Sequence, residues 1–174
     1  DQDIRKGGTS MKAMIARLQS EISDRQSYGP LYDFIKPVFD KSQYELALPM
    51  GMDIASTLKA VCALSEVGKH QAPGFAADFA HGKILNSTVP GINHETRAFL
   101  ALAVAHRYKG RKQMKQSYDA DRLLTPAQQN AAKAIGTAVN LAYRLTGGQL
   151  ALLPNFKLGI HAQAVHLKCT SEAA

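Results

Sequence analysis

Apolar residues recur at helical spacing in the first part of the chain. The first stripe follows Thr9-Ser10, a pair suited to cap a helix, and comprises Met11, Met14, Ile15, Leu18 and Ile22. A second helix is predicted from Gly29-Pro30 onward, where Pro37 should kink it or split it. Its apolar face comprises Leu31, Phe34, Ile35 and Val38.

The middle of the chain predicts further helices. Residues 52–68 are apolar on most sides, with Gly68 placed as the C′ stop. A turn at 72–75 precedes a short helix over 76–85. Asn93 should cap the next helix, which is apolar all round from 98 to 105 and should therefore lie in the centre of the domain, ending at Gly110. The last helix covers 125–148, with Thr125 as cap and Pro126 at its first position.

The apolar period changes after Pro154. Two alternating segments flank Ala162-Gln163 and predict a hairpin of short strands; they carry Phe156, Leu158 and Ile160, then Val165, Leu167 and Cys169. We therefore expect a mainly α fold, one domain over 1–174, with helices in 1–153 and a β-hairpin in 154–170.

Composition adds a basic balance. The 174 residues contain 21 Lys and Arg against 14 Asp and Glu, a net charge of +7, which favours anionic partners without identifying one. No apolar stretch is long enough to span a membrane, so we expect no membrane partner. Cys62 and Cys169 are too few for a disulfide framework, which favours a cytoplasmic protein. Because the chain begins at Asp1 rather than Met, we expect a piece of a longer protein.

Familiar catalytic motifs are absent from the sequence. There is no Gly-x-Ser-x-Gly elbow and no phosphate loop ending in Lys-Ser or Lys-Thr. The six histidines form no His-x-x-x-His pair, and none is followed by Asp. We therefore predict no catalytic residue and no metal ligand in this chain.

The most informative feature is a basic segment. No acidic residue lies between Glu95 and Asp119, whereas basic side chains are dense there: Arg97, His106, Arg107, Lys109, Arg111, Lys112 and Lys115. Favourable interaction with the helix dipole explains one or two of them. The guanidinium and ammonium groups of the others suit phosphate oxygens. A solvated basic turn is the alternative, and Arg97 could equally serve a structural ion pair.

The segment GINHETRAFLALAVAHRYKG resembles the central helix in the C-terminal region of the Ppx/GppA family, the exopolyphosphatases and guanosine pentaphosphate phosphohydrolases. LKAVCALSEVGKH is similar to the family helix that normally carries Leu-His-Asp-Ile-Gly. DQDIRKG and LAYRLTGG resemble the entry and the end of the same region. The resemblance covers nearly the whole chain. It implies an HD-like helical domain, in which Ser65-Glu66 stands where the family shows His-Asp.

The resemblance implies an accessory role. The parent would release terminal phosphate from polyphosphate with Mg²⁺ in N-terminal actin-like ATPase-type catalytic domains that are absent here, and this domain would need no cofactor. It would bind the polyphosphate chain through the basic segment, contact those catalytic domains and support a homodimer.

Other functions stay open on the sequence. The parent could be a guanosine pentaphosphate phosphohydrolase, or the chain could be a residual HD phosphohydrolase, although Ser65-Glu66 argues against a metal site. A nucleic-acid module is disfavoured because only Tyr108 and Tyr118 lie near the basic run. A purely structural dimerisation role would predict no response to polyphosphate.

Overall fold

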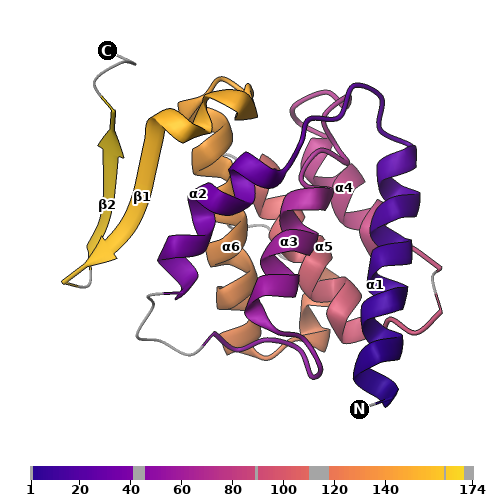
Figure 1. The fold of residues 1–174 in the computed structure, drawn as a ribbon. Helices are drawn as coiled ribbons and strands as arrows, with labels where there is room; N and C mark the ends of the chain where they lie inside the picture. The colour runs from indigo at the N-terminus through magenta and orange to yellow at the C-terminus, as the bar shows by residue number, and fades with distance from the viewer. Residues whose placement is uncertain (1, 41–45, 89, 110–117, 163, 171–174) are drawn as a thin grey trace.

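The chain folds into a helical body with a β-hairpin at its C-terminal end. The computed structural model describes residues 2–40, 46–88, 90–109, 118–162 and 164–170. Its elements are α1 (Gln2–Ser20), α2 (Gly29–Asp40), α3 (Ile54–Leu64), α4 (Ala76–Leu85), α5 (His94–Tyr108), the 3₁₀ helix η1 (Asp119–Leu123), α6 (Pro126–Leu145), the 3₁₀ helix η2 (Leu150–Asn155), β1 (Phe156–His161) and β2 (Ala164–Cys169) (Figure 1). The prediction of a mainly α fold with a terminal hairpin is confirmed.

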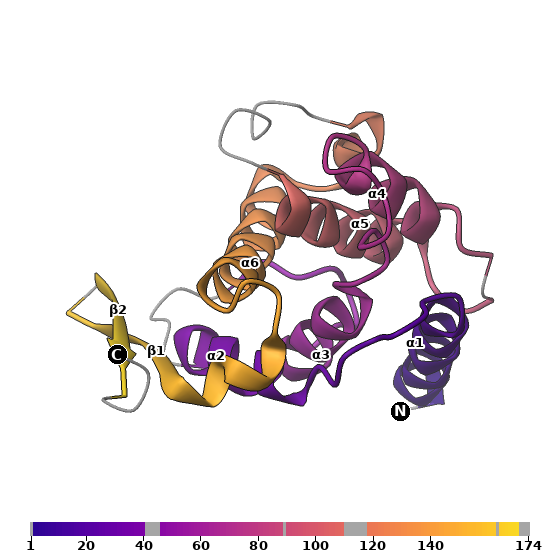
Figure 2. The ribbon, with the colours of Figure 1, turned by 90° about the horizontal axis from the view of Figure 1, so that it is seen from above.

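Helix α5 is the centre of the body. Every residue from 98 to 105 is at most 1% exposed, as the all-round apolar pattern predicts. Asn93 caps the helix as expected, because its Oδ1 accepts a hydrogen bond from Thr96 N at 2.7 Å. Helix α5 lies between α4 and α6 (Figure 2).

The contact between α5 and α6 is unusually close. Gly136 of α6 lies against Ala103, and a Cβ placed on Gly136 would be 2.2 Å from Ala103 O. Only a residue without a side chain fits at this crossing. Helix α6 begins as predicted, because Thr125 and Gln128 form a capping box.

The predicted start of the first helix was wrong. Helix α1 begins at Gln2, so Thr9 and Ser10 lie inside it rather than capping it; the helical conformation extends upstream of a pair that is compatible with a cap but does not require one. The stripe itself holds, because Met14 and Leu18 are buried. Helix α2 runs from Gly29 to Asp40 with Pro37 inside it, so of the two outcomes predicted for Pro37, a kink or a split, the split does not occur.

Helix α3 is the other correction, because it ends at Leu64 instead of reaching Gly68. The physical reason is a tyrosine. Tyr108 Oη donates to Ser65 O at 2.7 Å and accepts from Gly68 N at 2.9 Å. These backbone groups therefore have partners without another helical turn.

The hairpin lies at one edge of the molecule beside α2, opposite α1 (Figures 1 and 2). Strands β1 and β2 are antiparallel, with Leu158 opposite Leu167. Leu158 is buried on the helical side, whereas Val165 and Leu167 of the outer strand are 60% and 44% exposed. Within the described residues, no helix is long and apolar enough to cross a membrane.

Candidate anion-binding site at the end of α5

The C-terminal end of α5 is held in place by α6. Asn140 Nδ2 donates to Lys109 O at 3.1 Å, and it also reaches His106 O at 3.5 Å. Arg144 Nε in turn donates to Asn140 Oδ1 at 2.7 Å, which orients the amide. Carbonyl groups that a helix end normally leaves without partners are therefore satisfied by side chains. The basic end of α5 begins from a fixed backbone.

Arg107 is held between aromatic rings. Its guanidinium carbon lies 3.9 Å from the centroid of the Tyr108 ring and 3.7 Å from that of Tyr143. Among the described residues, no carboxylate forms an ion pair with it. Stacking of this kind fixes the plane of a guanidinium and leaves its charge available at the rim. Arg107 is half-buried, and the two rings hold the plane of its guanidinium.

Tyr108 and Tyr143 connect Arg107 to the Ser65-Glu66 position. Tyr143 Oη lies 2.9 Å from Ser65 Oγ, and Ser65 Oγ donates to Cys62 O at 2.7 Å. Burial raises the pKa of both tyrosines above the ordinary value, so both stay neutral hydroxyls. Ser65 is thus a structural hydrogen-bond partner.

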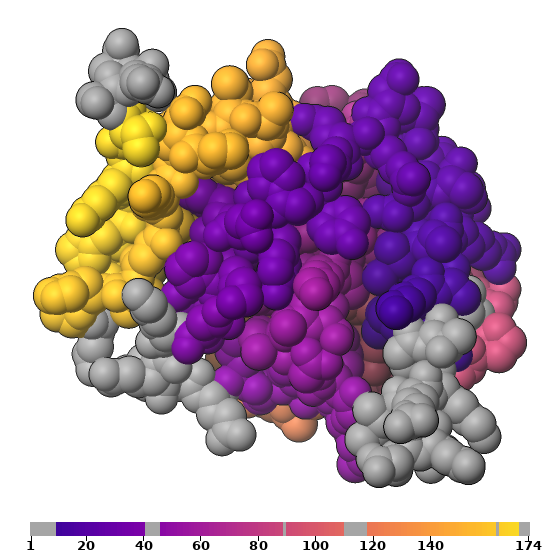
Figure 3. All heavy atoms as spheres, in the orientation of Figure 1, coloured from indigo at the N-terminus to yellow at the C-terminus, as the bar shows by residue number. Residues whose placement is uncertain are grey.

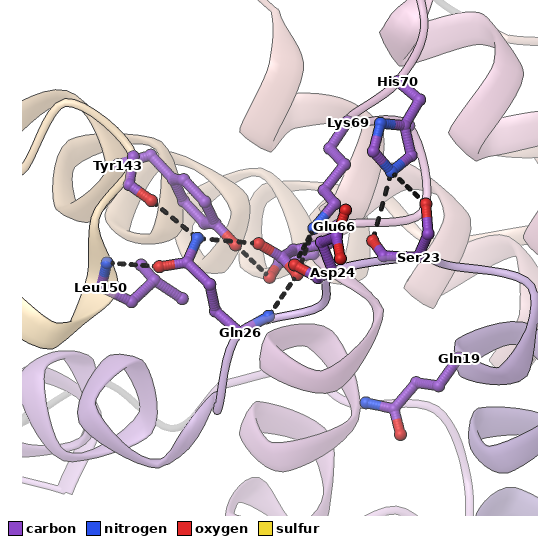
Figure 4. Close-up of polar contacts among 12 residues, drawn as sticks. Gln19, Ser23, Asp24, Gln26, Glu66, Lys69, His70, Tyr143 and Leu150 are labelled. Carbon is purple, nitrogen blue, oxygen red and sulfur yellow. Dashed lines mark hydrogen bonds and ion pairs between the residues drawn. The ribbon is translucent and has the colours of Figure 1, made fainter.

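Glu66 anchors a second network, shown in Figure 4. Its carboxylate accepts from Gln26 N at 2.8 Å and from Gln26 Nε2 at 3.0 Å, and Lys69 Nζ lies 3.4 Å away. Gln26 also donates to Gly148 O at 2.7 Å, and its Oε1 accepts from Leu150 N at 2.8 Å. Glu66 as a residue is 6% exposed, and both of its carboxylate oxygens accept hydrogen bonds. This network ties the segment after α1 to the turn after α6.

Lys109 faces the interior, which differs from the surface contact expected from the sequence. It is 1% exposed, and its Nζ lies 4.1 Å from the centroid of the Tyr118 ring. Burial lowers the pKa of Lys109, while the nearby carboxylates of Asp121 and Asp78 raise it. Lys109, the first residue after α5, points inward because the Tyr118 ring and the nearby carboxylates stabilise its ammonium group there.

Tyr118 is the centre of this inner cluster. Its ring stacks on His81 with centroids 3.7 Å apart, and its hydroxyl donates to Asp78 Oδ1 at 2.8 Å. Asp121 Oδ2 accepts from Tyr118 N at 3.0 Å. Burial lowers the pKa of His81, and Lys109 lowers it further, against the opposing effect of the two carboxylates.

His106 is also interior, at 3% exposed. Burial is the main cause that lowers its pKa to about 4, and Lys109 and Lys133 add to the effect. The ring is therefore neutral at neutral pH. Neither of its nitrogens has a hydrogen-bond partner among the described residues. His106 offers neither charge nor surface to an anion in this conformation.

Arg97 lies at the opposite end of α5 from Arg107. Its Nη1 donates to Ser87 O at 2.8 Å, and its Nη2 lies 3.2 Å from His94 Nδ1. These contacts join α5 to the loop after α4, in keeping with the structural alternative, although the partners are a carbonyl and an imidazole instead of a carboxylate. The structure does not bring Arg97 together with Arg107.

The remaining predicted contacts, Arg111, Lys112 and Lys115, lie outside the described residues, as does Gly110. The anion-binding role of Arg111, Lys112 and Lys115 stays a prediction.

The chemistry available for a metal is limited. Within the described part of the chain, no group of three or more His, Cys, Asp or Glu side chains is placed to hold a metal ion. At the Ser65-Glu66 position, the carboxylate is occupied by Gln26 and Lys69. No step of metal chemistry can be derived from these residues.

Several residues that shape the site escaped the sequence interpretation. Gln26 and Tyr143 join Glu66, Ser65 and Arg107 only through contacts distant in sequence. Tyr143 carried one usable signal, because a tyrosine on an apolar helix stripe needs a partner for its hydroxyl. Nothing in the sequence identified that partner.

Comparison with known proteins gives a family. A family model described as "Exopolyphosphatase, C-terminal" matches residues 52–170. No curated protein matches the chain. The matched range begins just before α3 and ends after β2, so it includes Arg107, Tyr108, Tyr143 and the Ser65-Glu66 position, whereas Gln26 precedes it.

Proposed function

The chain belongs to the exopolyphosphatase C-terminal family, and from that premise we propose that it is an accessory domain that binds the phosphate chain of inorganic polyphosphate at the end of α5. In this proposal the parent enzyme releases terminal phosphate in catalytic domains outside this chain. The present domain supplies attraction for the distal part of the substrate. It resembles an HD-like domain whose metal position serves a structural role.

The observation that carries the proposal is the stacked Arg107. A phosphate chain carries closely spaced negative charge, and two oxygens of one phosphate group can accept the paired N–H groups of a guanidinium fork. Because Tyr108 and Tyr143 already fix that fork, little side-chain entropy is lost on binding. Arg111, Lys112 and Lys115 follow in sequence and extend the basic track in the proposal.

The interior residues have a supporting role in the proposal. Lys109 and His106 are buried, so we assign them to holding the end of α5 and not to direct phosphate contact. Arg97 holds the start of the same helix. Of the described basic residues between Glu95 and Asp119, Arg107 is thus the one assigned to the ligand.

The test is a calorimetric titration of the 174-residue chain with long-chain polyphosphate at low and at raised salt. Binding to several phosphates should weaken steeply with salt, because bound counter-ions are released. We expect Arg107→Gln to weaken binding about tenfold or more, because it removes charge-assisted hydrogen bonds. Arg107→Lys should restore only part of the affinity, because it keeps the charge but not the fork.

The matched control is Arg122→Gln, which removes one charge from an exposed position on η1. Thermal unfolding of each variant separates lost binding from lost structure. Equal affinities of Arg107→Gln and Arg122→Gln would refute the site, and absence of binding at low salt would refute the function. Release of phosphate by the isolated chain would instead favour the residual phosphohydrolase. Tighter binding of guanosine pentaphosphate than of polyphosphate would favour the guanosine nucleotide alternative.

The proposal includes self-association, for which β2 is the most suitable described surface. This outer strand pairs only with β1 among the described strands, and it exposes Val165 and Leu167. Free apolar strand edges pair readily with further strands. Sedimentation velocity over a range of chain concentrations tests this part, and a monomer throughout would refute it.

A further inference from the structure

One face of the hairpin gathers basic side chains. The register places Lys157 directly opposite Lys168 and Gly159 opposite His166. Since alternate residues of a strand share a face, His161 lies on this face too. The rings of His161 and His166 meet edge to face, with centroids 6.0 Å apart. The apolar residues of both strands occupy the other face.

These side chains line a groove of about 490 Å³. The groove is also bordered by Gly159, by Leu158 and Ile160 of β1, whose side chains belong to the other face of the hairpin, and by Pro37 of α2. None of these described lining residues is acidic. Neither Lys157 nor Lys168 forms an ion pair with any described carboxylate. In Figure 3 the hairpin lies at the edge of the helical body beside α2. Lys157, His161, His166 and Lys168 are all exposed.

The groove has open space at its middle. Gly159 lies between Lys157 and His161 on β1, and a Cβ built on Gly159 would meet nothing within 4 Å. A ligand could therefore approach the backbone between the lysine pair and the histidine pair. A bulkier residue here would fill this space without relieving any contact inside the protein.

The repulsion between Lys157 and Lys168 destabilises the hairpin when no ligand is bound. Like charges directly opposite one another destabilise an antiparallel pair, and an isolated two-stranded hairpin is only marginally stable. Burial of Leu158 on the helical side offsets that cost. An anion between the lysines would remove the repulsion and replace it with attraction on both sides.

We propose that this groove is a second phosphate-binding site, separate from Arg107, which takes consecutive phosphate groups of a linear phosphate chain. The choice of ligand class rests on the proposed function. Lys157 and Lys168 contact phosphate oxygens, His161 and His166 donate further hydrogen bonds, and Gly159 admits the chain close to β1. Lys157 and Lys168, which belong to different strands, thereby form one site.

The first test is amide NMR of the ¹⁵N-labelled chain titrated with inorganic tripolyphosphate at low salt. A short probe reaches the sites independently. We expect concentration-dependent shifts at Lys157, Gly159, His166 and Lys168. Absence of shifts along β1 and β2 while Arg107 responds would overturn this proposal and leave the proposed function standing.

The second test compares charge-matched double variants by calorimetry with long-chain polyphosphate. Lys157→Thr/Lys168→Thr keeps strand propensity and removes the basic pair. We expect about fivefold to tenfold weaker binding than for the control Lys12→Gln/Arg122→Gln, which removes the same charge from exposed helical positions. Identical affinities of the two variants would overturn the hairpin site.

The outcomes separate the two proposals. Loss of binding in Arg107→Gln with no change in the hairpin variant refutes only the groove. The reverse pattern supports the groove and refutes Arg107 as the contact. Loss in both supports both sites. Displacement of polyphosphate by single-stranded DNA at equal phosphate concentration would assign the groove to nucleic acid and overturn the ligand class proposed here.

Discussion

Gly136→Ala tests the α5–α6 contact on which the candidate site depends. The added Cβ would lie 2.2 Å from Ala103 O and 2.7 Å from His106 Cβ. The first of these partners is backbone, so rotation of a side chain cannot relieve the overlap. The two helices must therefore separate along a contact that also positions Tyr143 against Arg107.

The magnitude is the difference of opposing effects. Overpacking of a tight core site costs about 3 kcal/mol, and a rigid backbone partner places this substitution at that upper end. The higher helix propensity of alanine stabilises the folded state by about 1 kcal/mol. The net destabilisation is therefore about 2 kcal/mol, which corresponds to a fall in Tm of about 4–8 °C for a chain of this size.

Gly82→Ala in α4 is the matched control. It also lies inside a helix, but its Cβ would meet only Asn86 Nδ2, at 4.0 Å. Only the difference in helix propensity then acts, and we expect the free energy of unfolding to rise by about 1 kcal/mol. Calorimetric and urea unfolding measure the stability of both variants and of the parent chain. A Gly136→Ala variant as stable as the parent, or changes of the same sign in both variants, would refute the close packing of α5 on α6.

Further predictions concern hydrogen bonding, pH and association. Tyr108→Phe should lower the free energy of unfolding by about 1–3 kcal/mol, because Ser65 O and Gly68 N lose their partner; urea midpoints measure this, and an unchanged midpoint contradicts it. The folded-state pKa of His106, about 4, lies below the ordinary 6.5, so the unfolded chain binds its proton first and stability is lost as the pH falls through that window. The loss is at most about 3 kcal/mol before solvent screening, and His106→Leu should show a smaller drop in urea midpoint between about pH 7 and about pH 4.5. Val165→Lys should weaken self-association in sedimentation velocity, and an unchanged dissociation constant would place the interface elsewhere.

The order and type of the long elements followed from local pattern. The apolar run from 98 to 105 predicted a central helix because a helix with no polar face must be covered on all sides. Asn93 and Thr125 predicted helix starts because a cap is a local interaction between a side chain and the next turn. The alternation after Pro154 predicted the hairpin because successive residues of a strand point to opposite faces, which is also a local property of the chain.

Local signals were less reliable at helix ends and in the candidate site. Gly68 carried the signature of a helix stop, yet α3 ends earlier because a tyrosine from α5 supplies hydrogen bonds to the following backbone. The basic segment was recognised from its composition, but composition could not show which of its members are buried and which face the solvent. The fold separates them, because Arg107 stacks at the rim while Lys109 turns inward to Tyr118.

The sequence by itself determined what depends on neighbours along the chain: the helices, the hairpin, the central position of α5 and the excess of positive charge. Tertiary structure alone decided which basic groups are buried, which aromatic rings receive them, and that Lys157 faces Lys168 across one groove. The physical reason is the range of the interactions. Helix periodicity and capping act within a few residues, whereas burial, stacking and charge depend on segments that only folding brings together.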